Sequence, residues 1–348
     1  MQLKLPSKLP YLILLSVIVV YLYSTILLQQ SSTLSATVTT TSSSTSVSCN
    51  FFQGRWVVDP KFPKPFYDET CPFHRNSWNC IRNKRENMVL INSWKWVPKD
   101  CDLTRIDPKS FLGLMRNKNI WFVGDSLNEN FLVSFLCVLR VADVGAKKWK
   151  KMGAWRGAYF PNFNVTVAYH RAVLLARYEW QPLKSAVDSE GSKGTYCVDV
   201  DIPADDWATV TDFYDVVIFN TGHWWGYDKF PMETPLVFYR DGKPIFPSLG
   251  LFDGLKVVLQ SMVSYIQKEL DTWFNPSNNG APHGTEIRLL EFSHLSEFRA
   301  DAHPAVWLGK RDAVAIWGQD CMHWCLPGVP ATWVDIFSQL THNRFETR

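Results

Sequence analysis

The stretch that decides the fold reads Asn119-Ile-Trp-Phe-Val-Gly-Asp-Ser-Leu-Asn128. Ile120 to Val123 is a short apolar run that stops at Gly124-Asp125-Ser126, which is typical of a buried β-strand that ends abruptly. Leu127 to Leu139 is apolar on nearly every side, which predicts a helix buried against a sheet. A serine at such a turn presents its hydroxyl at the sheet edge, where free N–H groups of the first helical turn can hold an oxyanion. Ser126 is therefore a candidate nucleophile, although Gly-Asp-Ser alone is a weak motif that also fits a turn with a helix-capping serine.

A second informative stretch, Asp320-Cys-Met-His-Trp-Cys325, lies near the C-terminus. An aspartate and a histidine three residues apart can contact each other, so that the carboxylate orients the imidazole as general base for a distant serine. This predicts a triad of Ser126, His323 and Asp320. Two alternatives remain open: a surface Asp–His pair beside a structural cysteine, and a metal site using the cysteines with His323. No second cluster of ligands accompanies the stretch, so we predict no metal.

The N-terminal residues predict a membrane protein. Residues 1–10 are basic and form the expected cytosolic tail, and residues 11–28 are apolar and uncharged, nearly long enough to span a bilayer as a transmembrane signal anchor. Residues 29–48 are rich in Ser and Thr and form a flexible stem. This is the layout of a single-pass type II protein of the Golgi membrane with its catalytic domain in the lumen. A cleaved signal peptide is the alternative, and it also places the rest of the chain in the lumen.

The cysteines and the charge agree with a luminal protein that does not bind nucleic acid. All eight cysteines follow the stem, and an even number in such a chain argues for disulfides, with buried free thiols as the alternative. Asn164 begins a sequon for N-glycosylation. The net charge of +3 and the lack of a long basic run make nucleic acid an unsuitable partner. No glycine-rich phosphate loop or dinucleotide fingerprint is present.

After residue 103 the pattern is that of an α/β protein. Helices are expected at residues 108–115, 253–270 and 333–340, and strands within residues 165–180, 215–219 and 287–292. The strand at 215–219 is followed by Asn220, Gly222 and His223. Active sites of such sheets lie at the carboxyl ends of strands, so this loop and Ser126 are expected to share one crevice.

Three motifs in this chain resemble one protein family. Gly124-Asp125-Ser126, Phe219-Asn-Thr-Gly-His-Trp-Trp225 and Asp320-Cys-Met-His-Trp-Cys-Leu-Pro-Gly-Val-Pro330 resemble the trichome birefringence-like proteins of plants, from Cys49 almost to the C-terminus. These are polysaccharide O-acetyltransferases with an SGNH/GDSL-like fold. The resemblance implies an α/β/α sandwich, the SGNH-hydrolase-like catalytic domain at 103–348, with a cysteine-rich N-terminal region at 49–102 wrapped around it.

The resemblance also implies a reaction. An acetyl group would pass from a donor such as acetyl-CoA, a co-substrate rather than a bound cofactor, through an acetyl-serine to a hydroxyl of a cell-wall polysaccharide of the xylan, mannan or pectin class. Asn220 would help to hold the oxyanion, with support from Gly124, Asp125, Gly222 and His223. The alternatives are an acetylesterase, in which water is the acceptor, and a noncatalytic protein that binds wall polysaccharide. The oligomeric state is not indicated.

The spacing of cysteines in the family implies three disulfides, Cys49–Cys101, Cys71–Cys137 and Cys80–Cys325. Cys321 has lost its usual partner in this chain, which leaves Cys197 as its expected partner.

The chain departs from the family pattern at two places. The family usually carries an arginine three residues after the nucleophilic serine, where this chain has Glu129, so any role of that arginine in binding an anion or the donor is in doubt. The family also usually carries a segment like Gly-Gly-Asp-Trp-Asn after its long helix. The stretch from Leu270 to Leu289 is too short to hold it, which predicts that a loop facing the substrate is missing.

Overall fold

The computed structural model describes residues 49–59, 64–150, 156–182, 193–208, 215–273, 288–309 and 318–346. The predicted tail, membrane segment and stem lie outside the described residues, as does most of the shortened stretch between Leu270 and Leu289. Among the residues that are described, no helix has the length and apolar character needed to cross a membrane.

The strand that ends at Gly124, β3, lies inside a mixed sheet. In the described part of the chain this sheet has five strands, in the order β4-β5-β6-β3-β9. β3 pairs in parallel with β6 and β9, whereas β4 and β5 are antiparallel. In this register Gly124 lies opposite both Arg171 and Asn220, so three strands end side by side. The bounds are β3 (Asn119–Gly124), β4 (Lys147–Lys150), β5 (Arg156–Phe160), β6 (Val165–Arg171) and β9 (Val216–Asn220).

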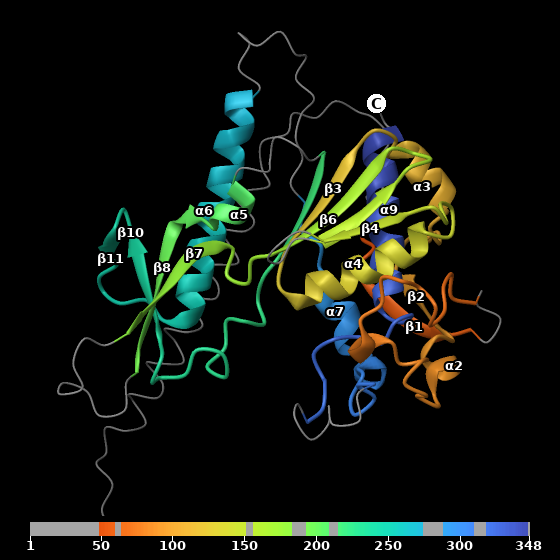
Figure 1. The fold of residues 1–348 in the computed structure, drawn as a ribbon, viewed down its shortest axis with the longest axis horizontal. Helices are drawn as coiled ribbons and strands as arrows, with labels where there is room; N and C mark the ends of the chain where they lie inside the picture. The colour runs from red at the N-terminus through yellow and green to blue at the C-terminus, as the bar shows by residue number, and fades with distance from the viewer. Residues whose placement is uncertain are drawn as a thin grey trace, which may run out of the picture. The chain divides into compact units, whose positions relative to one another are not determined.

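Helices α3 (Pro108–Leu114), α4 (Ser126–Leu139) and α9 (Pro330–Glu346) pack together with this sheet (Figure 1). Their shared core is aromatic: Phe135 contacts the rings of Phe111, Phe122 and Phe337. All three helices were predicted from the sequence, and α9 is longer than expected. Burial of these large rings provides much of the hydrophobic stabilisation of this half of the domain.

A second sheet has the order β11-β10-β8-β7 among the described residues and packs against α6 (Leu251–Trp273). Trp207, fully buried, contacts Phe219 of β9 and Tyr265 of α6, and so joins the two parts of the core. The fold is therefore mixed α/β, with α3, α4 and α9 packed together with the first sheet and α6 packed against the second. The expected α/β/α layering stays a prediction. The remaining bounds are β7 (Ala176–Pro182), β8 (Gly194–Pro203), α5 (Asp205–Ala208), β10 (Leu236–Arg240) and β11 (Lys243–Pro244).

One predicted strand is wrong. Phe292, expected at the end of a strand from 287 to 292, begins the short helix α7 (Phe292–Glu297), and residues 288–291 are not in a strand. The apolar run is short, and a run of this length cannot be assigned to strand or helix from its pattern alone. Phe292 stacks on Trp333 of α9, so packing decided its conformation.

The cysteine-rich region joins the same core instead of forming its own. It contains a pair of antiparallel strands, and its tryptophans at 78 and 96 are buried. As expected, disulfides join Cys49 to Cys101, Cys71 to Cys137 and Cys80 to Cys325. The elements are β1 (Gly54–Val58), η1 (Asn76–Trp78), α2 (Met88–Ile91) and β2 (Trp94–Pro98).

The fourth expected disulfide, Cys197–Cys321, is wrong: both cysteines are free. Cys197 is buried within β8 of the second sheet, whereas Cys321 is exposed on the loop of the predicted Asp–His pair. The two thiols belong to different parts of the fold, and a disulfide requires closely apposed Cα atoms.

Candidate active site

The turn that carries Ser126 has a strained and crowded backbone. Gly124 has φ of +151°, and a Cβ atom at this position would lie 2.1 Å from the backbone oxygen of Asn220. Only glycine therefore allows β3 to end so close to β9. The buried hydroxyl of Tyr169 donates to the carbonyl oxygen of Asp125 at 2.9 Å, which holds the turn from the neighbouring strand β6.

Asp125 is fully buried and organises the loop after β9. Its Oδ1 accepts the backbone N–H of Leu127 at 2.9 Å and so caps helix α4. Its Oδ2 lies 3.0 Å from Nδ1 of His223. The side-chain nitrogen of Asn220, in the amide orientation that satisfies its hydrogen bonding, donates to Oδ1 at 2.6 Å and to Oδ2 at 3.1 Å. A buried carboxylate needs several such donors, and these three supply them.

These contacts bring together the five residues expected to support an oxyanion. Asn220 and His223 bind Asp125, Gly124 permits the close approach of the strands, and Gly222 adopts φ of +154° between them. In this arrangement the side-chain amide of Asn220 donates its hydrogen bonds to Asp125. The role of Asn220 as an oxyanion donor stays a prediction.

Three consecutive polar side chains of helix α4 each bind a different part of the molecule. Asn128 donates to the carbonyl oxygens of Val123 in β3 and Ile218 in β9, at 2.9 and 3.0 Å. Glu129 forms ion pairs outside the helix, and Asn130 binds the backbone of Trp324. Sequence reasoning missed Asn128 and Asn130. The signal was present, since these polar residues interrupt an otherwise apolar helix.

Glu129 is buried, and its Oε1 accepts hydrogen bonds from Arg75 Nε at 2.6 Å and from Arg156 Nη1 at 2.5 Å. Burial raises the pKa of Glu129, and the positive charge of Arg75 opposes that rise. Arg75 comes from the cysteine-rich region and Arg156 from β5. The acid at position 129 therefore has two arginine partners that its own stretch of sequence does not contain.

The predicted contact between Asp320 and His323 is present. Asp320 Oδ2 accepts from His323 Nδ1 at 2.9 Å, and Oδ1 accepts the backbone N–H of Met322 at 3.0 Å and of His323 at 2.9 Å. Burial acts to raise the pKa of Asp320, but the hydrogen bonds and charge of His323 outweigh it and hold the pKa below its usual value. This arrangement makes Nδ1 the protonated nitrogen and leaves Nε2 as the basic one.

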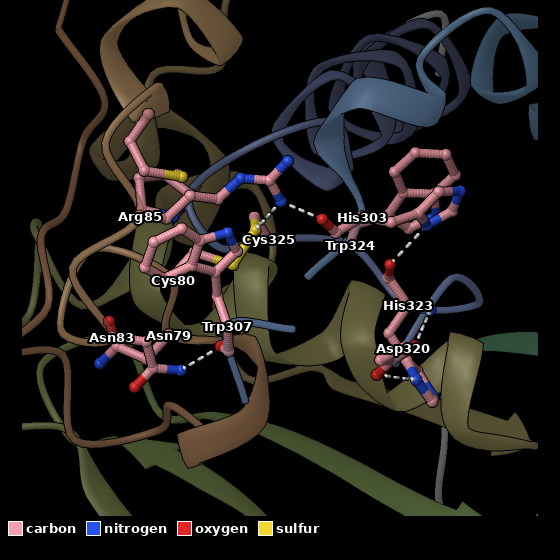
Figure 2. The surroundings of a disulfide bond; sticks show 12 residues. Asn79, Cys80, Asn83, Arg85, His303, Trp307, Asp320, His323, Trp324 and Cys325 are labelled. Carbon is pink, nitrogen blue, oxygen red and sulfur yellow. Dashed lines mark hydrogen bonds and ion pairs between the residues drawn. A yellow bond between two sulfur atoms is a disulfide. The ribbon is translucent and has the colours of Figure 1, made fainter. Parts of the chain in front are cut away.

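The loop that carries this pair is held from several sides, as Figure 2 shows. Nδ1 of His303 lies 2.7 Å from the carbonyl oxygen of His323, and the His303 ring stacks on Trp324 at 4.0 Å. Cys325 is bonded to Cys80, and Arg85 donates to Cys325 Sγ at 3.2 Å and to the carbonyl oxygen of His303. Because the sulfur of Cys325 is in a disulfide, the alternative metal site loses one of its ligands.

The loop that carries His323 is joined to the helix that begins at Ser126, and the catalytic triad itself stays a prediction. Asn130, one helical turn beyond Ser126, exchanges two hydrogen bonds with Trp324, the residue after His323. His323 Nε2 is buried and has no hydrogen-bond partner among the described residues, and Ser126 has no side-chain hydrogen bond there either. Catalytic hydrogen bonds are often loose in ligand-free enzymes and tighten when substrate binds.

A cleft of about 870 Å³ lies beside this pair. Asp320 and His323 form part of its wall, and Glu129, Arg75 and Arg156 form another part. Ser126 is half-buried and is not among the lining residues. A volume of this size accommodates a ligand of several rings. No group of three or more His, Cys, Asp or Glu side chains in the described ranges is placed to hold a metal ion.

The sequon residue Asn164 lies apart from this site, at the turn between β5 and β6. It is exposed, with φ of +53°, and its Nδ2 donates to Asn117 Oδ1 at 3.0 Å. Glycosylation of Asn164 stays a prediction.

Comparisons with known proteins cover almost the whole described chain. Residues 47–102 match the family described as "PMR5 N terminal Domain", and residues 103–277 and 275–340 match the "GDSL/SGNH-like Acyl-Esterase family found in Pmr5 and Cas1p". The chain is 60% identical over 352 residues to "Protein trichome birefringence-like 12" of Arabidopsis thaliana, an alignment that covers 86% of each chain. It is 38% identical over 357 residues to "Protein trichome birefringence-like 13" of the same plant, with 85% of each covered.

Proposed function

Because the chain belongs to the trichome birefringence-like family, we propose that it transfers acetyl groups to hydroxyls of a plant cell-wall polysaccharide. The observation that carries the proposal is the Asp320–His323 pair, whose loop is bound to the helix that begins at Ser126. The buried Nε2 of His323 has no partner among the described residues, so it is available to accept a proton.

In the first half of the proposed reaction, Ser126 Oγ gives its proton to His323 Nε2 and attacks the carbonyl carbon of the acetyl donor. With acetyl-CoA as donor, the carbon–sulfur bond breaks and the thiolate takes the proton from His323. In the second half, His323 takes the proton of a sugar hydroxyl, whose oxygen attacks the acetyl-serine. The carbon–oxygen bond to Ser126 then breaks, and Ser126 recovers the proton.

Each tetrahedral intermediate carries a negative oxygen that needs donors. In the proposed step, backbone N–H groups at the N-terminus of α4 supply them, helped by the positive end of the helix dipole. The backbone N–H of Leu127 already donates to Asp125, so it is not one of these donors. The side-chain amide of Asn220 can donate to the oxyanion only if it breaks its own hydrogen bonds to Asp125. Asp320 stays ionised and stabilises the imidazolium form of His323.

The proposal extends to the location of the protein. Residues 11–28 would anchor it in the Golgi membrane, with the described residues in the lumen. The three disulfides support an oxidising compartment.

The test is to incubate the full-length protein with isotopically labelled acetyl-CoA and a panel of xylan, mannan and pectin oligosaccharides. We expect one acetyl group on the peptide that contains Ser126, and labelled acetyl esters on one class of glycan. Ser126→Ala should lose both products. Ser134→Ala is the matched control, because Ser134 lies on the same helix and its side chain bonds, within the described part of the chain, to Tyr67 alone, at 3.0 Å. Label on another residue, or an active Ser126→Ala, would overturn the proposal.

A second candidate is an acetylesterase, which the name of the matching acyl-esterase family favours. It uses the same residues, with water in place of the sugar hydroxyl. The same incubation separates the two: free labelled acetate without acetylated glycan identifies the esterase.

A further inference from the structure

The cleft beside Asp320 and His323 is lined by an excess of positive charge. Among the described residues its wall contains two carboxylates, and each of them already has partners within the protein: Glu129 binds two arginines, and Asp320 binds His323. The chain as a whole has 36 basic and 33 acidic residues, so a positive excess inside one cleft does not follow from composition. The cationic side chains that the described residues place in the wall are Arg75, Lys148, Lys150, Arg156 and Lys229, and of these Lys229 is paired with Asp228 just outside the wall.

Glu129 holds the two arginines of this wall side by side. Both guanidinium groups bind the same carboxylate oxygen, so two positive charges converge on one negative charge. The side chains of Arg75 and Arg156 are 40% and 29% exposed, whereas that of Glu129 is 3% exposed. Arg75 Nη1 and Arg156 Nη2 make no hydrogen bond to any residue that the structure describes. The arginines therefore present unused N–H donors and a net positive charge to the cleft.

These charges lie next to the candidate general base. The guanidinium of Arg75 lies 5.5 Å from the ring centre of Trp78, and the ring of His323 lies 4.8 Å from the same indole. Trp78 is buried, and Arg75 and His323 both pack against its indole, so the two side chains lie close together in the wall of the cleft. A ligand whose anionic group binds the arginines is thereby placed with its neighbouring atoms beside His323.

We infer that this cleft binds the carboxylates of an acceptor polysaccharide that contains uronic acid, so that a neutral chain with the same backbone is a poorer ligand. Guanidinium groups match carboxylates in shape and charge, through two parallel N–H···O bonds. The exposed Lys148 and Lys150 continue the positive wall and provide point charges for further carboxylates along the chain. The inference rests on the proposed function for the role of His323.

The test measures binding of oligogalacturonides and of glucuronoxylan oligosaccharides to the full-length Ser126→Ala protein, by calorimetry without any acetyl donor. Each oligosaccharide is compared with its carboxyl-reduced form, which keeps the backbone and loses the charge. We expect at least one acidic oligosaccharide to bind about 10-fold or more tightly than its reduced form. The difference should shrink as salt is added. Equal binding of the acidic and reduced forms of both oligosaccharides would overturn the inference.

Variants separate this cleft from other basic surfaces. Arg156→Gln and Lys150→Gln should each weaken binding of the acidic oligosaccharide and leave binding of the reduced form unchanged, and Arg156→Lys should retain part of the affinity. Lys150→Gln is included because Lys150 is exposed and is not a partner of Glu129, so the change leaves the two ion pairs of Glu129 in place. Lys109→Gln, an exposed change on α3, is the control and should bind like the parent protein. Unchanged binding in both cleft variants would also overturn the inference.

The phosphates of coenzyme A share the same anion chemistry, so the donor is tested separately. Free coenzyme A should not displace the acidic oligosaccharide. Displacement together with equal binding of acidic and reduced oligosaccharides would assign the cationic wall to the donor instead. The binding measurement needs no turnover, so it is independent of the acetyl-transfer test. If the parent protein prefers the acidic oligosaccharide but does not transfer acetyl groups, only the proposed function is contradicted.

Discussion

Asn130 of helix α4 and Trp324 exchange two hydrogen bonds, one from Asn130 Nδ2 to the carbonyl oxygen and one from the backbone N–H to Asn130 Oδ1, each 3.1 Å long. Both residues are buried. This pair directly connects the helix that begins at Ser126 with the loop that carries His323.

We expect Asn130→Ala to lower the rate of acetyl transfer more than it raises KM, because it removes the attachment of the general base and not a substrate contact. It also leaves the buried N–H and C=O groups of Trp324 unpaired. Each unpaired group lowers the free energy of unfolding by at most about 1–3 kcal/mol. Steady-state kinetics with denaturant unfolding checks both effects. Gln339→Ala on α9, whose hydrogen bond is exposed, is the control. A variant with unchanged kcat would show that the loop is positioned by other contacts.

Gly124→Ala should lower the free energy of unfolding by more than about 2 kcal/mol, because alanine disfavours the observed φ and its methyl group would collide with the Asn220 carbonyl. Gly113→Ala is the matched control. Gly113 lies in helix α3 with open space around it, so alanine should raise stability there by about 0.5–1 kcal/mol. Urea unfolding of the two variants beside the parent tests the pair. Equal stability of both would mean that the turn relaxes without cost.

The stability difference between the parent and Asp320→Asn should depend on pH. The pKa of Asp320 is lower in the folded than in the unfolded chain, where it is about 3.9. Near these pKa values the folded state therefore binds fewer protons at Asp320 than the unfolded state does. The stabilisation that the ionised Asp320 gives the fold is fully present at pH values above its unfolded pKa. It is lost as the pH falls through the folded pKa. Unfolding free energies measured from pH 6 to pH 3 should converge for the two proteins, and a difference that widens on acidification would contradict the assignment.

The buried Glu129 is paired with two arginines, Arg75 and Arg156. We therefore expect Glu129→Arg to destabilise the fold strongly. It would place three guanidinium groups together and leave a buried charge unpaired, at a cost of about 3 kcal/mol or more. Glu129→Arg combined with Arg156→Glu should recover about 0.5–3 kcal/mol relative to the sum of the single changes. Thermal unfolding of the four proteins gives this coupling energy. Additive effects would show that Glu129 and Arg156 do not interact in solution.

The two free cysteines should differ in reactivity. Without reduction, iodoacetamide should label the exposed Cys321 in the native protein and the buried Cys197 only after unfolding. Peptide mass spectrometry counts the labels. If neither cysteine is labelled after unfolding, a disulfide between them would be indicated instead.

The sequence by itself was sufficient for features that are encoded locally. The apolar run before Gly124 and the long apolar helix after it predicted the strand–turn–helix unit correctly, and the spacing of Asp320 and His323 predicted their contact. The resemblance to a family predicted the three disulfides that are present. The strand–turn–helix unit and the Asp–His contact were predictable because the period of an apolar pattern and the reach of a side chain over three residues depend on little else. The disulfides join distant residues, so they came only from the resemblance and not from any local pattern.

Only the tertiary structure decided which distant residues meet. Glu129 lies 54 positions from Arg75 in the sequence, and Asn130 lies 194 positions from Trp324, so no local pattern relates them. The same is true of the free state of Cys197 and of the helix at Phe292, where packing against Trp333 outweighed a short ambiguous run. Such contacts depend on how the whole core packs, because a buried polar group takes the partners that the fold brings to it.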